Sequence, residues 1–415
     1  SVTVNAESLS PGDYNAVIMV TAPGATNSPQ VVSVALHVYS SGQSQPPFGS
    51  FDLPSGENVR SSVPFTGWAL DDIGMQSVKI YRQSGNSLVY IGDVIFVVGA
   101  RLDKEFPGYP GNYKAGWGYM MLTNFLPNGG NGVFTILAIA TDLEGHQVTL
   151  GSKTLTIDNA NAVKPFGAID TPAQGGTASG NNYRNWGWAL TPLPNTIPTD
   201  GSTIDVWVDG VNLGHPAYNI YRSDVAGLFP GYTNSNGSAG YYELNTTVYT
   251  NGLHTIFWTA EDNAGNVDGI GSRYFSIRNT ASSSQSNMLQ TVWEEDFTPD
   301  SSTPVGISKG YGKVLDPAQL KEVYPNEKGR ITIEVKELER IEVHLGSDNI
   351  LAGFMKVGNR SRSLPVGSTL DRQKGIFYWQ TGLAFVGKYH LVFVREDEAG
   401  NKIGRNIVVT IKPKF

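Results

Sequence analysis

Short segments in which apolar and polar residues alternate occur along most of the chain. A clear example is Ile204-Asp205-Val206-Trp207-Val208, which ends in the turn sequence Asp209-Gly210. Successive side chains of a β-strand point to opposite faces, so this alternation predicts strands with one face in a core. Gly, Pro, Asn and Ser cluster between the segments, as is typical of turns. The expected strands span residues 14–20, 31–38, 63–69, 77–82, 89–98, 133–140, 147–157, 204–208, 254–260, 329–335, 341–345 and 353–357.

One segment near the C-terminus predicts a helix instead. Asp316 is a suitable N-cap, Pro317 fits a first helical turn, and residues 318–323 fill the rest. The sequence therefore predicts an all-β protein with one short helix in its C-terminal domain.

An internal repeat organises the middle of the chain. Four segments occur twice, at separations of 118, 120, 123 and 120 positions. They are Pro47-Phe48-Gly49 with Pro165-Phe166-Gly167, Gly67-Trp68-Ala69-Leu70 with Gly187-Trp188-Ala189-Leu190, Phe106-Pro107-Gly108-Tyr109 with Phe229-Pro230-Gly231-Tyr232, and residues 131–145 with residues 251–265. A repeat of this length corresponds to one small domain. It predicts two copies of one fold, at residues 45–160 and 161–280.

Two further parts flank the repeats. Residues 1–44 contain only two expected strands and a polar linker, too little to bury a core of their own. We interpret them as the last strands of an incomplete Ig-like module. The first residue, Ser1, is not Met, so we expect an N-terminal piece to have been removed or left out. Residues 281–415 begin with a Ser-rich linker and predict a separate domain.

Three stretches resemble bacterial Ig-like modules. Residues 11–29, with Pro11-Gly12-Asp13-Tyr14 and Thr21-Ala22-Pro23-Gly24-Ala25, are similar to the end of BACON-type Ig-like domains. The strand, Asp-x-x-Gly turn and strand that end both repeats resemble the close of Ig-like and fibronectin type III-like modules. Residues 364–393 resemble a cadherin-like Ig domain of bacterial surface proteins, through Leu364-Pro365-Val366-Gly367, Gly375-Ile376-Phe377-Tyr378-Trp379 and Gly387-Lys388-Tyr389. Lys374 and Thr381 replace that family's usual Thr and Pro, both at turns. Together these resemblances imply tandem Ig-like β-sandwiches of a bacterial protein that is extracellular or at the cell surface.

Composition narrows the classes of partner and chemistry. The net charge is −7 and no basic run occurs, which disfavours nucleic acid and anionic membranes as partners. The chain has no cysteine, which excludes disulfides, zinc–thiolate sites and cysteine nucleophiles. No stretch approaches the roughly 18 apolar residues of a membrane-spanning helix, so we expect no membrane insertion.

The sequence offers little support for catalysis. The six histidines are scattered, and no HExxH, GxSxG or Walker pattern occurs. Carboxylate pairs such as Asp205 with Asp209 or Asp142 with Glu144 have the residue types of a glycosidase. However, Asp209 and Asp142 lie in expected turns, where Asp is common for conformational reasons. We therefore interpret the protein as not an enzyme, with no cofactor required.

The best metal candidate is the turn after the last alternating segment of the second repeat. Asp262, Asn263, Asn266 and Asp268 offer the oxygen ligands that calcium prefers. The equivalent turns at residues 142–146 and 397–401 have fewer such ligands, which favours a purely structural turn.

Aromatic residues give the most informative candidate site. Two Gly-rich stretches, residues 106–119 and 229–242, are expected to be long loops, and such loops commonly carry binding residues. Exposed rings there would stack on sugars, whereas buried rings would belong to the sandwich core. The candidate contacts to a ligand or a neighbouring subunit are Phe106, Tyr109, Trp117, Phe229, Tyr232 and Tyr242. The repeated tryptophans Trp68 and Trp188 are expected in the core.

These observations favour a non-enzymatic structural or adhesive protein, a surface stalk or fibre subunit. If Ser1 is the mature start, strands of a neighbouring copy would complete the N-terminal module and link copies head to tail. A sequence that simply begins within that module is the alternative. A different function, a carbohydrate-binding accessory region of a secreted protein, would use the aromatic loops. The expected partners are accordingly other copies of the chain or surface glycans.

Overall fold

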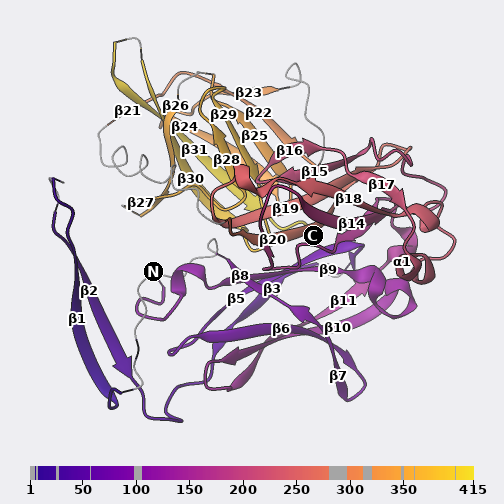
Figure 1. Ribbon diagram of the computed structural model, residues 1–415, viewed down its shortest axis with the longest axis horizontal. Helices are drawn as coiled ribbons and strands as arrows, with labels where there is room; N and C mark the ends of the chain where they lie inside the picture. Colours follow the sequence, from indigo (N-terminus) through magenta and orange to yellow (C-terminus); the bar gives the residue numbers. More distant parts are fainter. Residues whose placement is uncertain are drawn as a thin grey trace.

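A computed structural model of the chain is almost entirely β, as the alternation predicts (Figure 1). The structure describes residues 5, 8–24, 28–56, 58–97, 105–279, 297–311, 320–346, 350–358, 360–397 and 399–415. Within these ranges the strands form seven sheets, namely one two-stranded hairpin and two sheets in each of three domains. The prediction of tandem β-sandwiches is confirmed.

The first repeat is a sandwich of a four-stranded and a five-stranded sheet. The strand orders are β3-β5-β9-β8 and β4-β11-β10-β6-β7. The segment 89–98 is expected as one strand, but its described part, residues 89–97, is split between β7 and β8, which lie in opposite sheets. The bounds are β3 (Phe48–Leu53), β4 (Asn58–Val59), β5 (Ser62–Leu70), β6 (Met75–Ser84), β7 (Ser87–Asp93), β8 (Ile95–Val97), β9 (Gly116–Leu122), β10 (Gly132–Asp142) and β11 (Gln147–Ile157), with 3-10 turns η1 (Asn112–Lys114), η2 (Thr123–Phe125), η3 (Pro127–Gly130) and η4 (Asn159–Asn161).

The second repeat has the same topology. Its sheets have the orders β12-β14-β18-β17 and β13-β20-β19-β15-β16, which match those of the first repeat strand for strand. The repeated sequence thus encodes a repeated fold. The bounds are β12 (Phe166–Ile169), β13 (Thr177–Ala178), β14 (Tyr183–Leu190), β15 (Ile204–Val208), β16 (Val211–Gly214), β17 (Ala217–Ile220), α1 (Ser223–Leu228), η5 (Ser235–Gly237), β18 (Ala239–Leu244), η6 (Thr246–Val248), β19 (Gly252–Glu261) and β20 (Val267–Ile277).

The C-terminal domain is a third sandwich. Its sheets have the orders β21-β31-β30-β26-β27, with β24 parallel to β31, and β23-β22-β25-β29-β28. The bounds are β21 (Thr298–Pro299), β22 (Val305–Gly310), β23 (Lys321–Val323), β24 (Arg330–Lys336), β25 (Arg340–His344), β26 (Ile350–Val357), β27 (Arg360–Arg362), β28 (Ser368–Asp371), β29 (Ile376–Gln380), β30 (Gly387–Glu396) and β31 (Lys402–Lys412).

The helix expected in the C-terminal domain is not found where the structure describes that segment. Asp316, Pro317 and residues 318–319 lie outside the described residues, and residues 321–323 form strand β23, paired with β22. Ladder pairing to β22 outweighs the local helix preference there. Within the described part of the chain, the one α-helix is α1, in the second repeat.

The two repeats fill their cores with a tryptophan from opposite sheets. In the first repeat Trp117 of β9 packs over Gly67, where an added Cβ would lie 2.5 Å from the indole. In the second repeat Trp258 of β19 packs over the equivalent Gly187, where that distance is 3.2 Å. The position of Trp117 is taken by Gly240 in the second repeat, and the position of Trp258 is taken by Ala138 in the first. Each tryptophan therefore stands where the other repeat has a small residue.

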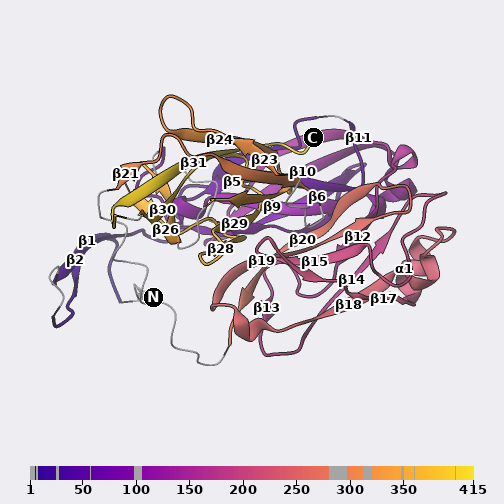
Figure 2. The same ribbon diagram turned by 90° about the horizontal axis from the view of Figure 1, so that it is seen from above.

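The N-terminal segment is an isolated antiparallel hairpin of β1 (Gly12–Val20) and β2 (Gln30–Val38). In both views it stands away from the sandwiches (Figures 1 and 2). Its two strands pair only with each other among the described residues. The two strands expected at residues 14–20 and 31–38 are therefore present.

The three sandwiches cluster together instead of following one another end to end as in a stalk (Figures 1 and 2). The Tyr274 hydroxyl of the second repeat donates to the Leu383 carbonyl of the C-terminal domain at 2.6 Å. Leu383 also packs against Gly118 of the first repeat, where an added Cβ would lie 2.5 Å from its side chain. The C-terminal domain therefore contacts both repeats.

The last residues of the chain join all three domains. The Lys414 ammonium donates to the Ser62 carbonyl of the first repeat at 3.1 Å and pairs with Asp268 of the second at 3.3 Å. Phe415 packs against the core of the first repeat. Close to this junction the fully buried Glu337 accepts one hydrogen bond, from the Ala384 N–H at 3.2 Å. Burial raises the pKa of Glu337 to about 8.

Candidate functional site

The motifs that occur twice in the sequence assemble into a cluster of four aromatic rings on each repeat. Corresponding ring pairs are nearly superposable: the interplanar angle is 32° between Trp68 and Phe106, and 33° between Trp188 and Phe229. Centroids lie 5.2 to 6.0 Å apart in the first cluster and 5.3 to 6.1 Å apart in the second. The first cluster is Phe48, Trp68, Phe106 and Tyr109, and the second is Phe166, Trp188, Phe229 and Tyr232.

The ring clusters lie on the outer face of a sheet. In β5 the core takes Val63, Phe65 and Ala69, so the alternation directs Trp68 to the other face. The prediction that the repeated tryptophans belong to the sandwich core is therefore wrong in detail. Trp188 is buried, at 2% exposure, but in a separate cluster outside the core of the second repeat.

The first repeat covers the ring cluster of the second. Leu122, at the end of β9, is 8% exposed and belongs to the apolar cluster around Trp188. Phe125, in the following turn η2, has its ring centroid 6.0 Å from Trp188 and 5.8 Å from Phe229. Trp68, by contrast, stays partly exposed, and no fifth ring joins its cluster among the described residues.

The structure separates the six residues predicted as loop contacts. Phe106, Tyr109 and Tyr232 lie in the loops as expected and are partly exposed. Phe229 is in the same kind of loop but is 6% exposed, because Phe125 covers it.

Trp117 and Tyr242 are not loop residues, so this part of the prediction is wrong. Trp117 pairs with Gly67 across β9 and β5, and its side chain is fully buried in the core. Tyr242 lies in β18, packs against the core of the second repeat and donates its hydroxyl proton to the Leu213 carbonyl at 2.8 Å. The strands begin earlier than the Gly-rich sequence indicates, because each glycine pairs within a ladder.

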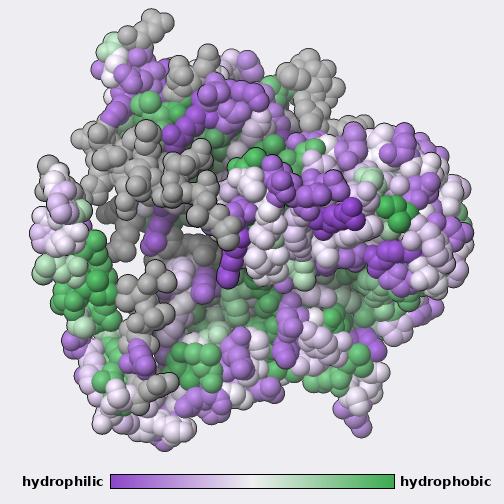
Figure 3. All heavy atoms as spheres, in the orientation of Figure 1, coloured by the Kyte–Doolittle hydropathy of each residue, from purple (hydrophilic) through white to green (hydrophobic). Residues whose placement is uncertain are grey.

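A cleft between the two repeats contains a cavity of about 630 Å³. This volume is in the usual range of small-ligand sites, roughly 300 to 1,000 Å³. Tyr90 and Phe125 stand at the cleft with 51% and 52% of their surfaces exposed. The hydropathy surface shows hydrophobic residues in the hollow between the repeats (Figure 3). Residues of both repeats line the cavity, among them Arg82, Tyr90, Tyr119, Phe125, Ala168 and Arg273.

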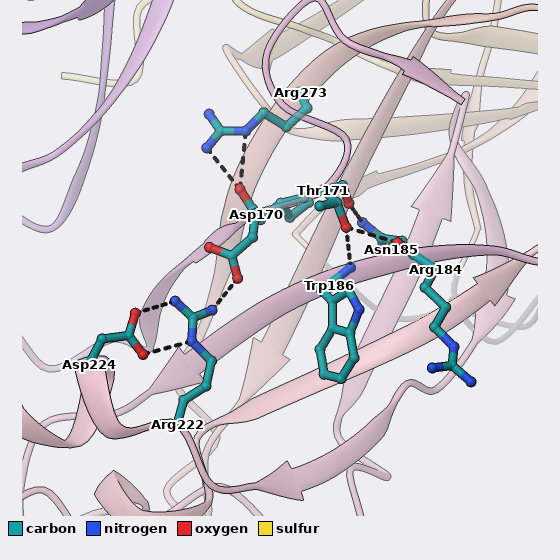
Figure 4. A network of polar contacts seen from close by, with 9 residues as sticks. Asp170, Thr171, Arg184, Asn185, Trp186, Arg222, Asp224 and Arg273 are labelled. Carbon is teal, nitrogen blue, oxygen red and sulfur yellow. Dashed lines mark hydrogen bonds and ion pairs between the residues drawn. The ribbon is translucent and has the colours of Figure 1, made fainter. Parts of the chain in front are cut away.

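Two arginines and two aspartates fix the end of β12 beside this cleft (Figure 4). Arg222 donates to both carboxylate oxygens of Asp224, at 2.9 and 2.6 Å, and pairs with Asp170. Hydrogen bonds from Arg222 lower the pKa of Asp224 to about 2. Burial raises the pKa of Asp170, while the charge of Arg222 opposes that shift. Because Arg222 directly precedes α1, the network holds α1 and the loop after it against β12.

Arg273 approaches the same strand end from β20. Its Nε and Nη2 donate to the Ile169 carbonyl at 3.2 and 2.8 Å. Burial lowers the pKa of Arg273, partly opposed by Tyr119 and Asp170. A partly buried guanidinium that lines the same cavity as Tyr90, Tyr119 and Phe125 suits the hydroxyl and carboxylate groups of a polar ligand.

The calcium candidate forms a hydrogen-bonded turn. Both carboxylate oxygens of Asp262 accept hydrogen bonds, from the Asn266 backbone and amide groups at 3.0 to 3.1 Å and from the Thr191 hydroxyl at 2.8 Å. The Asn263 amide oxygen accepts from the Thr196 N–H at 2.9 Å. Asp268 points to Lys414. Within the described residues, no group of three or more His, Asp or Glu side chains is arranged to hold a metal ion.

The turns at Asp142 and Asp397 have the same construction. Asp142 accepts from the Gly145 and His146 N–H groups at 2.6 and 2.8 Å, and Asp397 accepts from the Ala399 and Asn401 N–H groups at 3.0 and 2.7 Å. The aspartate in each final hairpin therefore holds the turn.

No family model and no curated protein matches this chain. Several solved structures are similar to this chain. The fibronectin(III)-like modules of Clostridium thermocellum CbhA have 15% identity over 56% of this chain and 94% of that one, with a TM-score of 0.18. A 1.5-MDa bacterial ice-binding adhesin has 11% identity over 89% of this chain and 99% of that one, TM-score 0.18. The Bacteroides ovatus glucan-locus protein SGBP-B, solved with a mixed-linkage heptasaccharide, has 10% identity over 89% and 71%, TM-score 0.19. Among the described residues, no helix is long and apolar enough to cross a membrane.

Proposed function

We propose that this protein is a non-enzymatic structural or adhesive subunit of a bacterial cell surface, whose copies join head to tail through the N-terminal hairpin. The observation that carries this proposal is the open apolar face of that hairpin. Its register pairs Tyr14 with Leu36 and Ile18 with Val32, so these four side chains share one face. The opposite face carries the Asp13–His37 pair, with 2.6 Å between Oδ1 and Nδ1, and also the exposed side chains of Val17, Met19 and Val31.

The hairpin has the pattern of half a sandwich. Val20 and Val32 on its apolar face are 54% and 51% exposed, and a hydrophobic patch lies on the middle of the hairpin in the space-filling view (Figure 3). Two strands alone are marginally stable in water, and open strand edges invite pairing with another chain. Strands of a second copy would cover this face and extend its edges, a heterologous contact that continues as an open fibre.

Sedimentation of the purified chain over a range of concentrations tests the proposal. We expect large assemblies that disappear in Ile18→Asp, which places a carboxylate on the apolar face, and persist in Ser33→Asp, which changes the opposite face. A chain that stays monomeric at every concentration would refute the proposal. So would a native protein, measured by intact mass, whose upstream strands close this module within one chain.

A second candidate function is glycan binding, favoured by the cleft between the repeats. Its exposed rings, Tyr90 and Phe125, stand beside Arg273 around a cavity of about 630 Å³. A glycan array with Tyr90→Ala tests it, with Tyr324→Ala as control because Tyr324 is 62% exposed and outside the residues that line the cavity. Loss of a glycan signal in the first variant alone supports binding in the cleft.

A further inference from the structure

Within the chain, a turn of the first repeat covers the ring cluster of the second repeat. The equivalent ring cluster of the first repeat and the equivalent turn of the second repeat do not meet in this way. Leu122 and Phe125 of the first repeat cover the ring cluster of the second, and the same cluster on the first repeat is partly exposed. We infer that the ring cluster of the first repeat binds the η6 turn of another copy of this chain. This contact uses a surface different from the hairpin, so it stands or falls independently of strand complementation.

The η6 turn is the structural equivalent of η2. In both turns a threonine donates its hydroxyl proton to a backbone carbonyl and lies beside an asparagine side-chain oxygen. In η2 these are Thr123, Ser61 and Asn159, at 2.8 and 3.1 Å, and in η6 they are Thr246, Gly180 and Asn279, at 2.7 and 2.7 Å. Two residues later the first repeat has Phe125 and the second has Val248.

Val248 is an apolar residue outside the hydrophobic clusters of the described residues. It is 73% exposed, more than any other large hydrophobic side chain in the described part of the chain. The position of Leu122 is taken by Asn245, whose side chain accepts from the Thr247 N–H at 3.1 Å and supports the turn. The contact would therefore rest on one valine and be weaker than the interface within the chain.

The geometry of the intrachain interface also gives the direction of assembly. The second repeat of one copy meets the first repeat of the next, so the two surfaces differ and the contact does not close on itself as a two-fold dimer does. Each added copy presents a new Val248 and a new Trp68 cluster. A short-lived chain of copies is expected, strongest where the hairpin already brings copies together.

Self-association of the full chain tests this surface in a background carrying Ile18→Asp and Val32→Asp, which disables the hairpin face. We expect concentration-dependent association that weakens about tenfold or more in Val248→Asp, which places a carboxylate against the rings. Val133→Asp is the matched control, because Val133 is 66% exposed on β10 and should change nothing. Val248→Phe, which copies Phe125, should strengthen association several-fold. Equal association of the Val248→Asp and Val133→Asp variants, or none in this background, would overturn the inference.

Cross-linking separates this contact from a symmetric one. The chain has no native cysteine, so single cysteines are unambiguous. Val248→Cys in one preparation and Glu105→Cys, beside Phe106, in another should cross-link through a short bis-maleimide only when mixed. Equal cross-linking in either preparation alone would overturn the head-to-tail arrangement. If the hairpin variants show no effect on assembly but the Val248 variants do, this contact is retained and only strand complementation is ruled out.

Discussion

Glu337 is a carboxyl group buried at the junction of the three domains, and replacing it with Gln tests how that junction responds to pH. The side chain is completely inaccessible, and one Oε accepts from Ala384 while the other has no partner among the described residues. Burial raises the pKa of Glu337 from 4.5 to about 8, against the attraction of Lys414. Gln has nearly the same shape and keeps an acceptor for Ala384 but never ionises.

The direction of the effect follows from proton binding. Below about pH 4.5 the carboxyl is protonated in both states and adds no pH dependence. Between pH 4.5 and pH 8 the unfolded chain releases the proton and the folded protein keeps it. The free energy of unfolding then falls by about 1.4 kcal/mol per pH unit, or about 3 kcal/mol by pH 7, and levels off above the folded-state pKa.

Chemical denaturation at a series of pH values measures this. Relative to the parent, Glu337→Gln should be near neutral at pH 4 and increasingly stabilised towards pH 8. Glu334→Gln is the control, because Glu334 lies on β24, three residues before the turn that holds Glu337, and is exposed. A Glu337→Gln protein whose unfolding free energy stays parallel to the parent from pH 4 to pH 8 would refute the reasoning.

Three further predictions concern the repeats. Asn185→Ala should lower the free energy of unfolding by about 1 to 3 kcal/mol, because the Trp258 indole N–H, which donates to Asn185 at 2.7 Å, loses its partner; unchanged denaturation midpoints would contradict this. Gly67→Ala should cost about 1 to 3 kcal/mol, since its Cβ would lie 2.0 Å from the Ser50 carbonyl oxygen, whereas Gly227→Ala, with open space around it, should not. A chelator should leave the melting temperature unchanged, because Asp262 is already hydrogen-bonded on both oxygens; a lower melting temperature would support calcium binding.

Much of the architecture could be predicted from local pattern. Alternation located most strands of the sandwiches, because a half-buried strand imposes period two on its own residues. The repeat predicted a shared topology, and the strand orders confirm it. The segment around residue 321 shows the limit. Its local sequence favours a helix. It forms a strand because it pairs with β22, and this pairing cannot be predicted from the segment's own residues.

The candidate site was harder to predict, because burial depends on contacts between repeats. The sequence marked the ring motifs but not which rings are covered, since Phe125 lies outside every repeated motif. The sequence did not indicate Tyr90 or Arg273 as site residues, because they line the same cavity only when the repeats pack together. Comparison of equivalent positions, Phe125 with Val248 and Trp117 with Gly240, is the one sequence signal that reveals where the two copies differ.

Packing of the C-terminal domain against both repeats limits how far the three domains can extend as a row. A stalk gains length from modules set end to end, but here Lys414 and Leu383 hold three sandwiches in one cluster. The three described sandwiches therefore add little length by themselves, and joining copies requires open surfaces outside this group of domains. The hairpin face and the Trp68 cluster are two such surfaces, and both lie in the N-terminal half of the chain. The proposed adhesive or fibrous role therefore depends on these two surfaces more than on the number of modules.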